Sequence, residues 1–192
     1  PETNDAVLSG MGDMHLDIVL SKIKERYKVD LDTRTPKVPY RETIKKKASA
    51  QGKHKKQSGG RGQYGDVWFE LAPLEKNAGI EFIDRVVGGA VPKNYIPAAE
   101  KGLREAAARG YLAGYPATDF SCAIFDGSYH DVDSSEMAFK IAASIAFKKC
   151  MEQANPILME PVMNVEVTVP EDCLGDVIGD LNSRRGLIMG ID

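Results

Sequence analysis

Cysteine and long apolar runs are both scarce in this chain of 192 residues. The three cysteines, Cys122, Cys150 and Cys173, form no C-x-x-C pair, which argues against a disulfide framework and against a structural zinc site. No apolar run approaches the ~20 residues that a membrane span needs, and no signal segment opens the chain. We therefore expect a cytoplasmic protein with no membrane partner. The first residue is Pro1 rather than Met, so we also expect a piece of a longer protein.

The overall composition is that of a globular protein, with 43% hydrophobic and 28% charged residues. The net charge of -3 conceals an uneven distribution. Residues 37–61 hold nine of the 25 Lys and Arg residues and only one of the 28 acids, Glu42, so the remainder of the chain is strongly acidic. Such a basic block is either a solvated segment or an arm that binds a polyanion.

The first of three segments, residues 1–38, contains one helix. Apolar residues recur with helical spacing from Leu16 to Tyr27, and Asp13 precedes them in a capping position. A short strand is expected over residues 29–33. This segment is too small to bury a core of its own.

The central segment, residues 39–158, is the largest. Strands are expected around Val67–Leu71, 80–87 and 119–125, and helices over 98–108 and 134–153. In the second helix, Ala138, Ile141, Ala142 and Ile145 form the expected buried stripe, and Asp133 followed by Glu136 resembles a capping box.

The last segment, residues 159–192, has the order strand, helix, strand. The strands are expected over 163–169 and 186–191, with a helix over 174–182 between them. Strand, helix, strand is half of a small α+β domain. Arg184 and Arg185 near the end of the helix either face RNA or offset the helix dipole.

The sequence G-R-G-Q-Y-G at residues 60–65 matches G-x-G-x-x-G but lacks the context of a dinucleotide site. Such a site follows a hydrophobic strand and opens a helix, whereas here a lysine-rich stretch precedes the glycines and an alternating strand follows them. No phosphate loop of the G-x-x-x-x-G-K-[ST] type exists in the chain. The surrounding segment, His54–Gly65, combines cations, amides and an aromatic ring on a glycine-rich turn, which favours contact with nucleic acid over a solvated hairpin.

A second dense polar cluster spans Gly127–Glu136 and includes His130, Asp131 and Asp133. Histidine among carboxylates is compatible with a metal site or an acid–base pair. Only two other histidines exist, and Asp133 is expected to cap a helix. We therefore favour an exposed loop whose histidine ring is available for stacking or hydrogen bonding.

Several motifs together resemble the C-terminal portion of bacterial elongation factor G, the ribosomal translocase. They occur in family order: L-S-G-M-G-D-M-H-L-D (8–17), P-Y-R-E-T-I (39–44), H-K-K-Q-S-G-G-R-G-Q-Y-G (54–65), Y-I-P-A (95–98), L-A-G-Y-P (112–116), G-S-Y-H-D-V-D-S-S-E-M-A-F-K-I-A-A-S-I-A-F-K (127–148) and G-D-V-I-G-D-L-N-S-R-R-G (175–186). They cover essentially the whole chain.

The resemblance implies an α+β, multi-domain piece of that factor. Residues 1–38 would end domain III, 39–158 would be domain IV, and 159–192 would start domain V. The central domain would be an α/β sandwich-like unit with a ribosomal-protein-like βαβ fold, and the two flanking domains would be partial and ferredoxin-like. The GTPase domain, with its GTP and Mg, would lie elsewhere in the parent, so this piece is expected to have no cofactor and no enzyme activity of its own.

The resemblance also implies an RNA-contacting tip made of two loops. We define the first tip loop as residues 57–63 and the second as residues 128–133. The residues expected to contact RNA are Lys55, Lys56, Gln57, Ser58, Gly59, Gly60, Arg61, Gly62, Gln63, Ser128, Tyr129, His130, Asp131 and Asp133. One departure from many members is the acid Asp66 directly after Q-Y-G.

The implied partners are the ribosome, with its rRNA at the small-subunit decoding centre, and tRNA and mRNA. The protein is expected to be monomeric and to promote translocation when its tip enters the A site. The alternatives are a paralogue with a recycling, ribosome-protection or other specialised role, and an enzyme that uses His130 with Asp131 or Asp133. The parent would be the GTPase.

Overall fold

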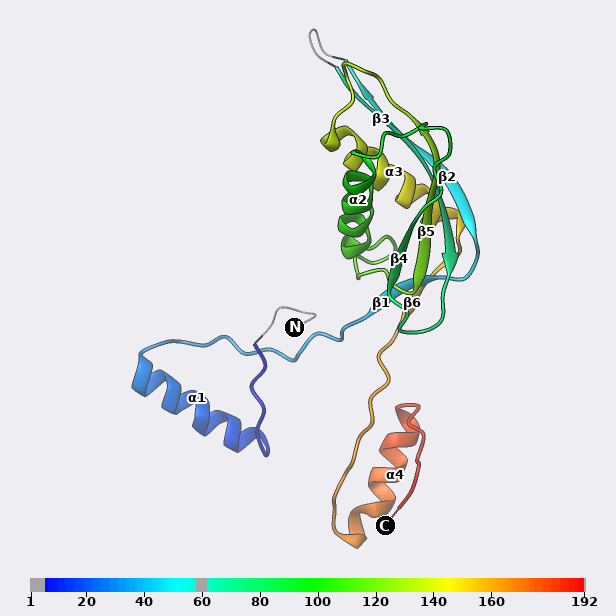
Figure 1. Cartoon of the computed structure of the whole chain (residues 1–192). Coiled ribbons are helices and arrows are strands. Elements are labelled where there is room, and N and C mark those ends of the chain that lie inside the picture. Colours follow the sequence, from blue (N-terminus) through cyan, green and yellow to red (C-terminus); the bar gives the residue numbers. More distant parts are fainter. Residues whose placement is uncertain (1–5, 58–61, 192) are drawn as a thin grey trace. The chain divides into compact units, whose positions relative to one another are not determined.

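The computed structural model describes residues 6–57 and 62–191. The chain divides into two compact units, with the boundary between Pro161 and Val162. The first unit contains α1 (Asp13–Tyr27), β1 (Arg41–Ile44), β2 (Ala48–Lys56), β3 (Gln63–Pro73), β4 (Ile80–Asp84), α2 (Ile96–Arg109), β5 (Phe120–Ser128), α3 (Glu136–Gln153) and β6 (Pro156–Met159). The second contains η1 (Glu171–Cys173) and α4 (Leu174–Ser183). The mixture of helices and small sheets confirms the α+β class (Figure 1).

The central domain is built on a four-stranded sheet in the order β2-β3-β5-β4. The pairs β2–β3 and β3–β5 are antiparallel, and β4 is parallel to β5. A short two-stranded sheet joins β1 to β6, the two strands at the ends of this domain's sequence. Helix α3 packs against β2 and β3, and α2 packs against α3, so that both helices cover the same face of the sheet (Figure 1).

Small residues let α3 lie close to the sheet. The buried face of α3 is formed by Ala138, Phe139, Ala142, Ala143, Ala146, Phe147 and Cys150, and the two isoleucines of the expected stripe are only partly buried. A Cβ placed on Gly52 of β2 would lie 2.0 Å from the carbonyl oxygen of Ala142. Gly52 is therefore needed because the helix backbone occupies the space that any larger side chain would require.

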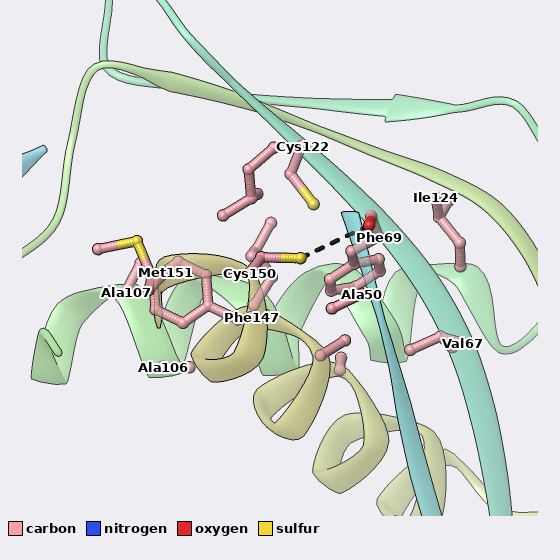
Figure 2. Close-up of a cluster of buried hydrophobic side chains, with 14 of the residues drawn as sticks. Ala50, Val67, Phe69, Ala106, Ala107, Cys122, Ile124, Phe147, Cys150 and Met151 are labelled. Atoms are coloured by element: carbon pink, nitrogen blue, oxygen red, sulfur yellow. Dashed lines mark hydrogen bonds between the residues drawn. The ribbon is translucent and has the colours of Figure 1, made fainter. Parts of the chain in front are cut away.

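Apolar side chains of α2, α3 and the four-stranded sheet fill the space between the helices and the sheet (Figure 2). Phe69 and Phe147 lie in this core with Cys150, whose Sγ donates to the carbonyl oxygen of Phe69 at 3.5 Å. At the tip-facing end of α2, the Tyr95 ring stacks on Phe139 with centroids 4.6 Å apart. These contacts hold α3 rigidly against the strands that lead to the candidate site.

The buried carboxylate of Glu42 organises the loop after α2. Glu42 is fully buried, and its two oxygens accept four backbone N–H groups, from Tyr111, Leu112, Ala113 and Tyr115, at 2.6–3.3 Å. Burial by itself would raise the pKa of Glu42, but these four donors outweigh it and lower the pKa below its ordinary value. Glu42, the lone acid of the basic block, is thus a structural anchor.

Several expected elements are confirmed. The helices α1, α2, α3 and α4 and the strands β3, β4 and β5 all lie where the sequence predicts them, within a few residues. In α1 the partly buried side chains include Leu16, Val19, Leu20 and Ile23 of the predicted stripe, whereas Tyr27, its last member, is exposed. Asp13 is the first residue of this helix and does not cap it; the N-cap is Gly12.

Other expectations were wrong. Residues 29–33, 163–169 and 186–191 form no strand, and each of these segments holds exposed apolar side chains such as Val29, Met163 and Met189. A strand needs a paired neighbour, and the described part of the chain provides none there. Conversely, the lysine-rich stretch before the glycines is strand β2, because β3 pairs with it along its whole length.

Candidate nucleic-acid interface

The first tip loop closes the β2–β3 hairpin. The last two pairs of that ladder are Lys55 with Tyr64 and Lys56 with Gln63, so both lysines are carried to the end of a rigid ribbon. Their side chains are exposed. The expected contact residues Ser58, Gly59, Gly60 and Arg61 lie outside the described residues.

The second tip loop joins β5 to α3 and meets the base of the first (Figure 1). The Gly62 N–H donates to Asp133 Oδ1 at 2.9 Å, and the Tyr64 N–H donates to the Asp133 carbonyl oxygen at 2.8 Å. The Ser134 hydroxyl adds a third link by donating to the Tyr64 carbonyl oxygen at 3.0 Å. Segments that are about 70 residues apart in sequence are therefore hydrogen-bonded into one unit.

Asp133 was expected to cap α3, but it does not. The capping residue is Ser135, whose hydroxyl accepts the Ala138 N–H at 3.2 Å, and the helix begins at Glu136. Ser135 has the extended backbone of an N-cap, while Asp133 lies two residues earlier. The Asp133 carboxylate instead faces Gly62, where it holds the first tip loop.

Asp66, the departure noted in the sequence, is a further part of this framework. Its side chain is almost fully buried and accepts from Gln51 Nε2 at 2.9 Å and from Ser128 Oγ at 2.7 Å. Since the Ser128 hydroxyl gives its proton to that carboxylate, the Tyr64 hydroxyl donates to Ser128 Oγ, at 2.7 Å. Asp66 therefore anchors the start of the second tip loop rather than opposing the exposed lysines.

Ser128 was expected at the RNA surface, and neither Asp66 nor Ser134 had an expected structural role. The available signal was the alternation of β3, which puts Tyr64, Asp66 and Trp68 on one face. The pairing of Asp66 with Ser128 depends on the register of β3 against β5, which sequence spacing alone does not determine.

His130 is held by its own loop. Its backbone N–H donates to Ser134 Oγ at 2.9 Å, and its ring Nδ1 lies 3.3 Å from the backbone nitrogens of both Val132 and Asp133. The side chain is 55% exposed, and the nearest carboxylate oxygen, Asp133 Oδ2, is 3.7 Å from Nδ1. That separation is too long for the hydrogen bond of an acid–base pair.

A hollow of about 170 Å³ lies where the two loops meet, lined by Lys55, Lys56, Gln57, Gln63, Tyr64, His130 and Asp133. Lys53 extends the cationic side of this region, with its Nζ 5.5 Å from the centre of the Tyr64 ring. Cations, amides and rings on a hydrogen-bonded frame can bind phosphate, ribose and base edges. The resemblance predicts contact through Tyr129 and Asp131 as well, and their side chains are exposed.

Other site types find no support in the described part of the chain. Within residues 6–57 and 62–191, no three His, Cys, Asp or Glu side chains gather closely enough to hold a metal ion. None of the described helices is long and apolar enough to cross a membrane. Arg184 is the C-cap residue of α4, and its Nε lies 2.7 Å from Asp180 Oδ2, four residues earlier.

Comparison with known proteins gives three consecutive family matches. Residues 1–35 match the family model described as elongation factor G domain III, residues 36–155 match domain IV, and residues 157–192 match the elongation factor G C-terminus. A crystal structure of a protein from Thermus thermophilus is similar at 49% identity with a TM-score of 0.83. The match covers 95% of this chain and 27% of that one, so the chain spans about a quarter of its relative's length.

Proposed function

Because the chain belongs to the elongation factor G family, we propose that its central domain is an RNA-contacting strut of a translational GTPase. The two tip loops enter the A site at the decoding centre of the small ribosomal subunit and contact rRNA, tRNA and mRNA. They hold the codon–anticodon duplex in place while tRNA and mRNA advance. The protein acts in the cytoplasm as a monomer.

The observation that carries this proposal is the joining of the two tip loops into one hydrogen-bonded unit. Asp133, Ser134 and Asp66 face inward and satisfy backbone and hydroxyl groups. Lys55 and Lys56 remain exposed at the end of the hairpin. A polar frame whose internal bonds are satisfied can present cations outward without rearranging, which lowers the entropic cost of binding.

No bond is made or broken at this tip in the proposed mechanism. Binding and positioning are its whole contribution, and GTP hydrolysis belongs to a separate domain of the parent. The central sheet supports this role mechanically, since α3 packs against both β2 and β3, the strands that carry the first tip loop.

The first test is the salt dependence of RNA binding by this chain. Lys55→Ala/Lys56→Ala should reduce the slope of log affinity against log salt by about 0.7 for each phosphate contact that the substitutions remove. The matched control is Lys46→Ala/Lys76→Ala, which removes two exposed lysines from the turns at the other end of the same strands. Equal slopes for the two double variants would mean that the tip lysines are only solvated.

The second test is single-turnover translocation by the full-length parent. Lys55→Ala/Lys56→Ala should slow tRNA movement while ribosome-stimulated GTP hydrolysis stays near normal, because the hydrolytic domain is unchanged. A parent that binds ribosomes and hydrolyses GTP but moves no tRNA, even without substitution, would instead identify a paralogue with a recycling or other specialised role.

A further inference from the structure

We infer that His130 acts through a single ring atom, Nε2, which carries the proton and donates it in a hydrogen bond to an acceptor oxygen of RNA. Its other nitrogen, Nδ1, is committed to the loop. The RNA partner in this inference rests on the proposed function, whereas the state of the ring rests on the structure alone.

The contacts of Nδ1 determine where the proton lies. Backbone N–H groups can only donate, and those of Val132 and Asp133 both lie 3.3 Å from Nδ1. Nδ1 must therefore offer its lone pair, and a neutral imidazole with a bare Nδ1 carries its proton on Nε2. The only carboxylate oxygen near Nδ1 in the described residues is 3.7 Å away, too far to reverse this preference.

The orientation of the ring follows from the rest of the loop. The His130 N–H donates to Ser134 Oγ, and that hydroxyl donates in turn to the Tyr64 carbonyl oxygen. The residue is thus tied to β3 through its backbone and to Val132 and Asp133 through its ring. Its side chain is still 55% exposed, and in the described residues no hydrogen bond involves Nε2.

An outward N–H selects its partner by chemistry. It can pair with a non-bridging phosphate oxygen, a ribose 2′-hydroxyl or a base carbonyl, and it cannot accept from a base amino group. Lys55 and Lys56 line the same hollow and favour the negatively charged phosphate among these acceptors. The second tip loop would therefore bind an acceptor oxygen of RNA through His130, without any need for a positive charge on the ring.

Two substitutions separate the two nitrogens. His130→Gln can bring an amide N–H to about the position of Nε2, and His130→Asn can bring an amide oxygen to about the position of Nδ1. The inference predicts that Gln keeps oligouridine affinity within about 2-fold of wild type, while Asn and Ala each lose about 5-fold, the value of one ordinary hydrogen bond. Thermal unfolding of each variant reports the loop contacts separately, and there Asn should retain more stability than Gln.

The decisive measurement is the tautomer itself, from long-range proton–nitrogen NMR of the labelled chain near neutral pH. A bare Nδ1 and a protonated Nε2 are expected, and a protonated Nδ1 would overturn the inference. Equal affinity losses for Gln and Asn would overturn it too. If wild-type chain binds no oligouridine yet shows the expected tautomer, the proposed function fails while the assignment of the ring stands.

The source of the acceptor is distinguished by comparing oligouridine with its 2′-deoxy counterpart. If His130→Ala loses the same factor on both strands, the acceptor is a phosphate or base oxygen. If the loss disappears on the deoxy strand, the acceptor is the ribose hydroxyl. Either result supports a donor at Nε2, whereas a gain in affinity on replacing His130 with Ala contradicts it.

Discussion

Replacing Glu42 is the sharpest test of how the central domain is held together. This carboxylate is fully buried, and four backbone N–H groups of residues 111–115 converge on it. In Glu42→Ala those four donors lose their acceptors inside the protein. Hydrogen bonds to a charged group are worth about 1.5–3 kcal/mol each but do not add fully, so we expect a loss of about 3–5 kcal/mol in the free energy of unfolding.

Glu42→Gln isolates the charge from the volume. The amide keeps one acceptor oxygen and turns the other into an NH₂ group that faces N–H donors, so about 2–4 kcal/mol should be lost with no cavity created. The matched control is Glu81→Gln on β4, whose side chain is exposed and should change stability by less than about 0.5 kcal/mol. Urea unfolding near pH 7 measures all three variants.

The pH dependence gives an independent check with a defined sign. The four donors lower the pKa of Glu42 in the folded state, whereas in the unfolded chain it has the ordinary glutamate value of about 4.5. The stability that the charge supplies is therefore complete above that ordinary value and is lost as the pH falls through the lower folded value. The gap between wild type and Glu42→Gln should narrow from pH 7 to pH 3. A gap that stays constant, or an effect no larger than that of Glu81→Gln, would refute this account.

Two further predictions concern the core of the same domain. Gly52→Ala should destabilise this domain by about 1–3 kcal/mol or more in thermal unfolding, because the new methyl group would overlap the backbone of α3. The control Gly175→Ala should have little effect, because nothing lies within 4 Å of its added Cβ. Burial raises the pKa of the Cys122 thiol and raises that of Cys150 to about 12. A thiol reagent should therefore modify only the exposed Cys173 quickly in the native chain, and all three cysteines after unfolding. Two or more fast-reacting thiols in the folded protein would contradict the packing.

The sequence by itself determined the elements that carry a strong period. The helices α1 and α3 and the alternating strand β3 follow from side chains that repeat with the helix or strand, because such a pattern records which face must leave water. Helix α2 follows from its content of Ala, Leu and Glu, which favour the helical backbone. The motif resemblance also identified the two loops of the candidate site, since their residues lie in unbroken runs.

The tertiary structure decided which contacts the residues of β2 and of the two tip loops make. β2 has a sequence rich in Lys and Gly and is a strand because β3 offers it a complete ladder, while the apolar segments around residues 163–169 and 186–191 stay unpaired in the described chain. Asp133 became a link to Gly62 instead of a helix cap, and Asp66 became an anchor for Ser128. The roles of Asp133 and Asp66 each depend on a hydrogen bond of about 3 Å between residues more than 60 positions apart. Such a bond is set by strand register and helix packing, which no local pattern of residues encodes.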